Sequence, residues 1–328
     1  RGKISSIVHY HNSYFVGFLM DGILLLEKQK ETDHYQIQSL PINSGVFCLK
    51  KDRFQDVVWI GTDGQGVYLY SNPLYSIKSM VLSNYTEKIE RPVRAIYLDD
   101  ECTFWVGTKG NGILKIYDYE FDKNISDCRA EVLTTSNSAL SSNAVYCFAK
   151  SHRNLLWIGD EEGLTYYSYR EKRIKSIPIR IGNEDFKYIH DIYETADSEL
   201  WLASVGMGVV KARIAGTSDN PVIVDAQRYI INDGELGSNY FFTIYAENEA
   251  NLLFGNKGYG VFRYNETTNG LEPVSTHKYE NMTLNNILAI SKDSSNNYLF
   301  GTSYGLIKYT SETSYQLFNA KKIGRAHV

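Results

Sequence analysis

One phrase recurs along the whole chain, and its period limits the possible fold more than any other feature of the sequence. "VWIGTDGQGVYLY" (Val58–Tyr70) returns as "FWVGTKGNGILKIY" (Phe104–Tyr117) and as "LWIGDEEGLTYYSY" (Leu156–Tyr169). Aligned on the small residue that ends the first apolar burst, the phrase occurs seven times, at Gly17, Gly61, Gly107, Gly159, Ala203, Gly255 and Gly301. Successive markers are 44 to 52 residues apart, which is the period of four-stranded propeller blades.

Each marker is preceded by a second motif at a nearly constant distance. A run of alternating character, such as Val46–Leu49 before Gly61, begins 14 or 15 residues before six markers and 13 before the first. The β-branched and aromatic residues of both motifs suit strands, and Gly64 and Gly66 suit the tight turn between two of them. Each repeat therefore predicts four strands, the last a weaker segment such as Ile174–Ile179.

Four short strands cannot bury both faces of their sheet alone, so neighbouring repeats must stack, and radial stacking leaves only short protected edges. We therefore predict an all-β fold, a β-propeller of seven four-stranded blades, over residues 1–320. One closed ring is favoured because the chain starts on a first strand and ends after a fourth; the alternative is that the repeats straddle two rings. Residues 322–328, "KIGRAHV", lack repeat character and resemble the translation of a sequencing adapter, so we expect a non-native tail there.

Charge and composition argue against several classes of protein. The chain has 34 Lys and Arg against 38 Asp and Glu, a net charge of −4, and no basic stripe, which argues against a nucleic-acid partner. Its apolar runs stop far below the roughly 18 residues of a membrane helix. The four cysteines have no C-x-x-C spacing, and Cys48 and Cys147 occupy a register that takes small residues in other repeats. We expect these two to be buried, and we expect no metal and no cofactor.

Two longer segments carry a family resemblance. They are "NSALSSNAVYCFAKSHRNLLWIGDEEGLTYYSY" (Asn137–Tyr169) and "DGELGSNYFFTIYAENEANLLFGNKGYGVFRY" (Asp233–Tyr264). Both resemble the two-component regulator propeller repeat, and the resemblance extends from residue 4 to about residue 318. The chain departs from that pattern at Ala203, which replaces a marker glycine, and at Asp160, which replaces the threonine of "WIGT".

This resemblance implies the periplasmic sensor part of a bacterial hybrid two-component system. In that family two propellers and an immunoglobulin-like domain precede a membrane helix and a sensor histidine kinase, and the usual stimulus is an oligosaccharide. The implied partners are therefore an oligosaccharide ligand, a neighbouring propeller and an immunoglobulin-like domain outside this chain, in a parent that could pair as a homodimer. For this chain the resemblance implies binding, and we expect no catalytic residue in it.

The candidate binding residues lie in the first strands, which line the channel of a propeller, and in the loops that lead into them. A sugar ring needs a flat apolar surface, planar polar groups for its hydroxyls and, if it is acidic, a cation. The candidate apolar surfaces are Tyr146, Tyr188 and Tyr240, and the candidate planar polar groups are Asn143 and Asn239. The candidate cations are Arg94, Lys187 and His190. The plainer alternative is that Tyr146 and Phe242 pack between blades.

A carboxylate at Asp191 stands where other repeats have a small residue. Buried carboxylates need a partner, and the candidates are Lys187, His190 or a neighbouring blade.

Two other functions stay open. A polysaccharide-cleaving propeller would need two carboxylates roughly 5 to 10 Å apart across a cleft. The acidic clusters are Asp99–Asp100, Asp160–Glu162 and Glu184–Asp185, and the first two fall in expected turns, where solvated acids are common. A tyrosine-rich face also suits protein partners, so a protein-interaction scaffold is the second alternative.

Overall fold

The computed structural model describes residues 2–28, 34–53, 55–71, 76–80, 82, 89–119, 128–231, 239–274, 286–311 and 314–318. The expected tail at 322–328 lies outside the described residues.

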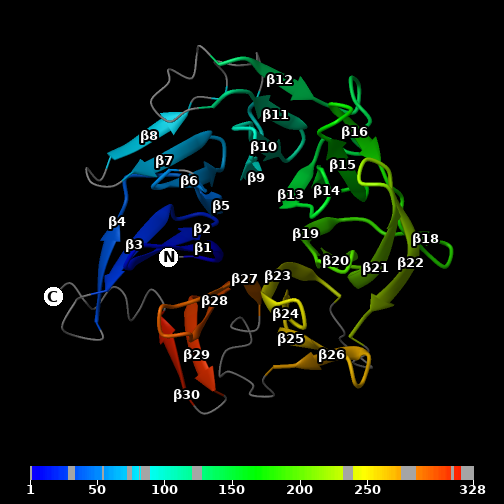
Figure 1. The fold of residues 1–328 in the computed structure, drawn as a ribbon. Helices are drawn as coiled ribbons and strands as arrows, with labels where there is room; N and C mark the ends of the chain where they lie inside the picture. Colours follow the sequence, from blue (N-terminus) through cyan, green and yellow to red (C-terminus); the bar gives the residue numbers. More distant parts are fainter. Residues whose placement is uncertain are drawn as a thin grey trace.

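The described strands form seven four-stranded antiparallel sheets that stand as blades around a central axis (Figure 1). In every blade the strands follow chain order, the first innermost and the fourth outermost. This architecture confirms the predicted all-β propeller of seven four-stranded blades. Blades 1 to 4 contain β1 (Ile4–Tyr10), β2 (Ser13–Phe18), β3 (Ile23–Lys28) and β4 (Tyr35–Ser39); β5 (Val46–Lys51), β6 (Val57–Thr62), β7 (Val67–Ser71) and β8 (Ser76–Met80); β9 (Val93–Leu98), β10 (Phe104–Thr108), β11 (Ile113–Ile116) and β12 (Ala130–Leu133); β13 (Val145–Lys150), β14 (Leu155–Asp160), β15 (Leu164–Ser168) and β16 (Arg173–Ser176).

A small hairpin precedes the fifth blade. It consists of β17 (Arg180–Ile181) and β18 (Glu184–Asp185). Blades 5 to 7 contain β19 (Ile189–Glu194), β20 (Glu199–Ser204), β21 (Gly208–Gly216) and β22 (Pro221–Tyr229); β23 (Phe241–Asn248), β24 (Asn251–Asn256), β25 (Gly260–Asn265) and β26 (Gly270–Pro273); β27 (Ile287–Lys292), β28 (Tyr298–Thr302), β29 (Leu306–Ser311) and β30 (Ser314–Phe318). In the described part of the chain, no helix is long and apolar enough to cross a lipid bilayer.

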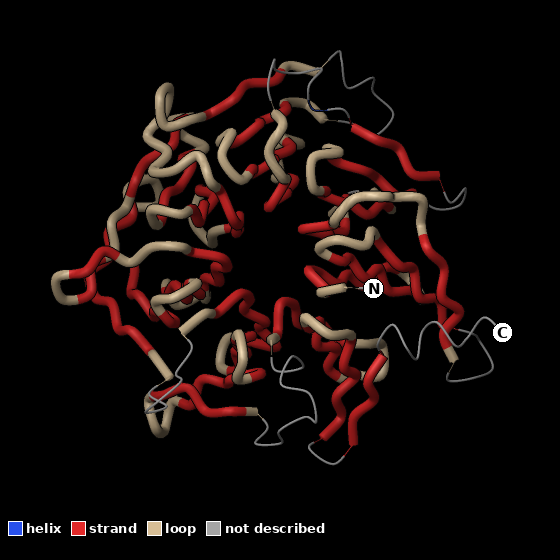
Figure 2. Tube along the Cα trace, turned by 180° about the vertical axis from the view of Figure 1, so that it is seen from behind, coloured by secondary structure: helices blue, strands red, loops and turns tan. Residues whose placement is uncertain are grey.

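The ring closes between the seventh blade and the first, which lie side by side in both views (Figures 1 and 2). Strand β1 contacts β27 and β28 as well as β5, and the Ser294 N–H donates to the Tyr14 hydroxyl across the seam at 3.0 Å. No strand is exchanged at this seam, because each sheet contains four consecutive strands. The seven repeats therefore form one ring, and the alternative of two partial rings is wrong for this structure.

The marker glycines explain the repeat in physical terms. Each lies on the second strand of its blade, where the next blade packs closest. A Cβ at Gly61 would meet Cys48 Sγ at 2.5 Å and Val93 Cγ1 of the next blade at 2.8 Å. Cys48 and Cys147 are buried in this slot, as predicted. The small residue and the glycine together let adjacent sheets approach, which is why the phrase ends in glycine.

A buried lysine lies between blades 3 and 4, outside the channel. The Lys115 side chain is 3% exposed. Its Nζ donates to the Tyr167 hydroxyl at 2.7 Å and lies 4.8, 4.3 and 4.1 Å from the ring centroids of Trp105, Tyr117 and Tyr167. The nearest carboxylate, that of Glu131, is 3.8 Å away. Burial lowers the pKa of Lys115 to about 8.

This depressed pKa predicts a pH dependence of stability. Between about pH 8 and pH 10.5, Lys115 is protonated in the unfolded chain but has released its proton in the folded one. The free energy of unfolding therefore increases as the pH rises through this range. Relative to Lys115→Met, the wild-type free energy of unfolding should rise by about 1 kcal/mol from pH 7 to pH 9. Urea denaturation of both proteins at the two pH values measures this difference, and the tyrosines and carboxylates cancel because both proteins share them. A difference independent of pH would contradict the depressed pKa.

Candidate ligand-binding site

The first strand of every blade carries a β-bulge at the same position. In all seven blades the register between the first and second strands shifts around the second residue of the first-strand motif. A bulge bends its strand and re-aims the extra side chain. The seven bulged residues, which we call the collar, are Ser5, Phe47, Arg94, Tyr146, His190, Phe242 and Leu288.

The whole collar lines one cavity of about 360 Å³, which we call the channel cavity. The other lining residues come from the ends of blades 1, 6 and 7: Lys3, Leu19, Lys257, Asn286 and Ser303. Sevenfold repetition of one local distortion therefore brings residues from all parts of the sequence together at the ring axis.

Rings cover a continuous arc of the collar. The Arg94 guanidinium carbon lies 4.3 Å from the centroid of the Phe47 ring, a cation–π contact. Tyr146 and His190 stack at 4.3 Å with an interplanar angle of 23°, and the His190 and Phe242 rings form a T-shaped pair with centroids 5.7 Å apart. Blades 2 to 6 thus contribute aromatic rings and one cation to the lining, while Leu288 and Ser5 complete the collar.

The channel cavity is electropositive. Lys3, Arg94 and Lys257 line it, and none of its described lining residues is acidic. The Arg94 Nε is buried and has no hydrogen-bond partner among the described residues, and burial lowers the pKa of Arg94. Burial, with a smaller contribution from Arg94, lowers the pKa of His190 to about 3. The imidazole is therefore neutral at ordinary pH and contributes an aromatic face rather than a charge.

The partly buried Asp191 is held by backbone groups. Its carboxylate accepts the Ile192 N–H at 2.9 Å and the Ile244 N–H of the next blade at 2.7 Å. Burial raises the pKa of Asp191. Of the expected partners, the neighbouring blade is confirmed, and no ion pair links Asp191 to Lys187 among the described residues.

Three of the eight candidate residues, Arg94, Tyr146 and His190, meet in the channel cavity. Tyr146 and Phe242 are bulged residues that line the channel, and both rings also pack against His190 of the blade between them, so the alternative of packing between blades holds beside the channel position. The other five candidates, Asn143, Lys187, Tyr188, Asn239 and Tyr240, do not line this cavity.

The two amides hold loops in place. The Asn143 carboxamide oxygen accepts the Thr135 N–H at 2.9 Å, and the Asn239 oxygen accepts the Ile231 N–H at 2.8 Å. The main-chain carbonyl of each asparagine also accepts two N–H groups from a glycine-containing turn, those of Gly110 and Gly112 or of Gly206 and Gly208. Both amide oxygens are thus already used inside the fold.

The remaining three candidates lie outside the channel cavity, and of these Tyr240 lies at its mouth, beside the lining residue Lys257. Tyr188 and Tyr240 are 41% and 40% exposed, and Lys257 Nζ lies 5.0 Å from the Tyr240 ring centroid. Lys187 pairs with Glu162 at 2.5 Å and lines, with Asn239, a second and shallower pocket of about 520 Å³. Tyr188 has a φ of 56°, uncommon for a bulky residue.

One backbone hydrogen bond shapes this mouth in every blade. The residue two positions after each marker donates its N–H to the carbonyl of the residue that precedes the first strand. The seven pairs are Leu19 and Lys3, Asp63 and Gly45, Lys109 and Pro92, Glu161 and Ala144, Val205 and Tyr188, Lys257 and Tyr240, and Ser303 and Asn286. The rim is therefore built by the same motif that defines the repeat.

Sequence reasoning missed several lining residues. Phe47, Leu288 and Ser5 belong to the collar, and Lys3 and Lys257 lie at its rim. A signal was present, because all collar residues occupy the second position of the first-strand motif. Comparing that one position across all seven repeats would have found Ser5, Phe47 and Leu288, but not Lys3 and Lys257, which lie outside the first strands.

The acidic clusters have structural roles. The Asp99 carboxylate accepts the Trp105 Nε1–H at 2.8 Å and two backbone N–H groups of its own turn. Asp160 accepts the Ser141 hydroxyl at 2.6 Å and two backbone N–H groups, and burial raises its pKa to about 6. No group of three or more His, Cys, Asp or Glu side chains suited to a metal occurs among the described residues.

No protein-family model matches the chain. Among solved structures, the chain is similar to an extracellular domain of B. thetaiotaomicron assigned to the hybrid two-component system BT4673, with a TM-score of 0.56 and 14% identity over 97% of this chain and 48% of that one. It is also similar to the WD40 repeats of RRP9, with a TM-score of 0.64 and 10% identity over 98% and 92% of the two chains.

Among curated proteins, translation initiation factor 6 of Saccharolobus solfataricus is 29% identical over 140 residues, which is 39% of this chain and 57% of that protein. The chain thus spans about half the length of the B. thetaiotaomicron domain and of this curated protein. At these identities the two solved structures show the propeller fold alone, which the B. thetaiotaomicron domain and the WD40 repeats share with this chain.

Proposed function

We propose that this chain is the ligand-sensing propeller of an extracytoplasmic, periplasmic receptor of the hybrid two-component type, and that it recognises an oligosaccharide. One observation carries the proposal: seven bulged residues converge on a single concave cavity with aromatic and cationic walls. The similarity to the BT4673 domain supports the receptor context.

The chemistry of the collar suits a sugar. Tyr146 and His190 supply aromatic surface in the lining against which the apolar C–H groups of a pyranose would pack, and Arg94 and Asn286 offer donors for oxygen atoms. A cavity of about 360 Å³ falls within the range of small-molecule sites. Ligand binding would favour one packing of the propeller on its neighbouring domains and so bias a histidine kinase outside this chain.

We propose binding without catalysis. Glycoside hydrolysis needs two carboxylates that flank the scissile bond, whereas no described residue that lines the channel cavity is acidic. Asp99 and Asp160, the acids of the two turns, are engaged in hydrogen bonds within their own loops.

A melting experiment on the full chain tests the proposal. A panel of neutral, uronic-acid and sulfated oligosaccharides should contain at least one that raises the melting temperature, because a ligand at 100 times its Kd stabilises the folded state by about 2.7 kcal/mol. Tyr146→Ala should abolish the shift, whereas Val222→Ala, at an exposed site on the outer edge strand β22, should keep it. A flat response across the panel would contradict the proposal.

A protein-interaction scaffold is the second candidate. Tyr188, Tyr240 and Ile230 are 41%, 40% and 39% exposed, and exposed aromatic side chains at a rim suit a protein partner. The similarity to WD40 repeats of RRP9 is consistent with this function. A flat glycan response, together with a partner whose binding is lost in Tyr188→Ala and kept in Tyr146→Ala, would favour the scaffold.

A further inference from the structure

We infer that the channel cavity receives the acidic end of its ligand, a terminal carboxylate or sulfate group, and that Arg94 is the residue that binds it. This inference rests on the proposed function and specifies the class of oligosaccharide and the direction in which it enters.

Arg94 is a partly buried cation, and no acidic residue among the described lining of the cavity balances its charge. It is the one cationic residue of the collar, and no ion pair or hydrogen bond joins it to a carboxylate among the described residues. Asp63 acts on its charge from outside the cavity lining. Withdrawing a cation from water without an anionic partner costs free energy. An anion bound at this position would offset the hydration that the guanidinium has lost.

The geometry of Arg94 prepares it for an oxyanion. The guanidinium carbon of Arg94 lies over the Phe47 ring, 4.3 Å from its centroid, and this cation–π contact supports the group from one side. The buried Nε–H is unsatisfied within the described structure. A planar guanidinium with a free N–H edge binds carboxylate and sulfate oxygens through two parallel hydrogen bonds.

The surroundings favour one sign of charge. Lys3 and Lys257 share the cavity with Arg94 and no described lining residue is acidic. A concave site lined by one sign of charge concentrates the opposite charge. The neutral His190, stacked on Tyr146, adds apolar aromatic surface to the cavity that holds the Arg94 cation. An acidic sugar presents the matching combination, a charged group on a ring with C–H faces.

The direction of entry follows from the ring. Seven first strands surround the cavity, and the collar residues face one another across the axis. A polysaccharide chain cannot cross this wall sideways, so it must enter along the axis with one end first. The cavity therefore recognises a terminal sugar residue. Internal sugar residues of the same polysaccharide would lie at the mouth near Tyr188 and Tyr240.

The test compares matched ligands on the full chain by calorimetry. The probes are oligosaccharides with a terminal uronic acid, the same compounds with the carboxyl reduced to an alcohol, terminally sulfated oligosaccharides and inorganic sulfate. We expect the best acidic probe to bind at least tenfold more tightly than its reduced counterpart, and its affinity to fall with added salt. Arg94→Gln should erase this preference, while the charge-matched surface control Arg180→Gln, at a side chain 75% exposed, should retain it.

The possible outcomes distinguish failure of the acidic-end inference from failure of the proposed sugar-sensing function. Equal affinity for acidic and reduced probes, both lost in Tyr146→Ala, would overturn the anionic end and leave the sugar sensor standing. Tight binding of polymers without an acidic terminus would likewise overturn it. Failure of every probe would overturn both. If Arg94→Gln does not fold, Arg94→Lys keeps the charge without the fork and should lose several-fold in affinity for the acidic probe only.

Discussion

Replacing Gly159 by valine should lower the free energy of unfolding by about 3 kcal/mol, because overpacking at an interface without free space forces backbone and side chains apart. A Cβ at this position would meet Cys147 Sγ at 2.5 Å and both Cγ2 and the carbonyl oxygen of Ile189 at 2.8 Å. Ile189 begins β19 of the next blade. The contact with its main chain cannot be relieved by a side-chain rotation, so blades 4 and 5 must separate.

Gly270→Ala is the matched control. A Cβ there would meet nothing closer than 3.8 Å, and the residue does not need a positive φ. Chemical denaturation followed by tryptophan fluorescence compares the two variants with the wild type. Gly270→Ala should be nearly neutral, and equal losses in the two variants would mean that the marker glycine does not set the distance between blades.

The same glycine shows why the fold was predictable from the sequence. Each blade approaches the next most closely at its marker position, and only a small residue fits there. A ring of seven blades therefore needs a small residue at seven equivalent positions. Ala203 is consistent with this, since it is itself buried completely at the same position. The period, the hairpin and the number of blades all follow from that one steric requirement.

The collar was predictable only in part, because a bulge leaves no separate mark in the sequence. Regular alternation along a first strand would direct Tyr146 and Cys147 to opposite faces of the sheet, one against each neighbouring blade. The register shift between Val145 and Cys147 removes Tyr146 from this alternation and aims it at the axis. Residue type suggested Tyr146, Arg94 and His190, whereas only the repeated geometry includes Phe47 and Leu288.

The two loop asparagines, Asn143 and Asn239, do not line the channel cavity, and residue type could not show this. Asn143 and Asn239 were candidates because amides recognise sugar hydroxyls, but amides also recognise backbone N–H groups of nearby loops. Thr135 and Ile231 each lie eight residues before the asparagine that holds them. Competition between these uses depends on where the preceding loop runs, and that path is a property of the three-dimensional fold.

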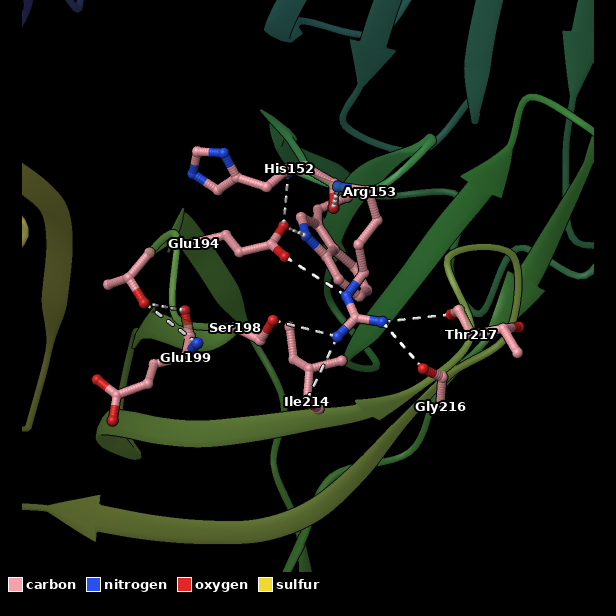
Figure 3. A network of polar contacts seen from close by, with 11 residues as sticks. His152, Arg153, Glu194, Ser198, Glu199, Ile214, Gly216 and Thr217 are labelled. Atoms are coloured by element: carbon pink, nitrogen blue, oxygen red, sulfur yellow. Dashed lines mark hydrogen bonds and ion pairs between the residues drawn. The ribbon is translucent and has the colours of Figure 1, made fainter.

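Replacing Arg153 by methionine should destabilise the ring by about 3 to 5 kcal/mol, the cost of leaving a buried charge without its partner. Arg153 projects from the turn between β13 and β14 into blade 5 (Figure 3). Its Nε lies 3.8 Å from Glu194, whose side chain is 1% exposed. The Glu194 carboxylate also accepts the Trp157 Nε1–H at 2.6 Å, so it cannot turn towards water without breaking that bond.

The guanidinium also holds the long hairpin of blade 5. It donates to the carbonyls of Ile214, Gly216 and Thr217 and to the Ser198 hydroxyl, at 3.2 to 3.4 Å (Figure 3). Three of these four acceptors are backbone groups, so the side chain replaces hydrogen bonds that the hairpin end would otherwise make with water. Methionine keeps the aliphatic stem and removes all of these donors at once.

Two further variants separate the charge from the hydrogen bonds. Glu194→Gln keeps an acceptor for Trp157 and removes the buried negative charge, so the double variant should lose less than the sum of the single losses. Arg170→Met is the control, since Arg170 pairs with Asp219 at the same blade boundary but is 76% exposed, and exposed pairs contribute little. Urea denaturation of all four variants measures the coupling. If Arg153→Met lost no more stability than Arg170→Met, blade 5 would be held by its apolar contacts alone, and the buried pair would be dispensable.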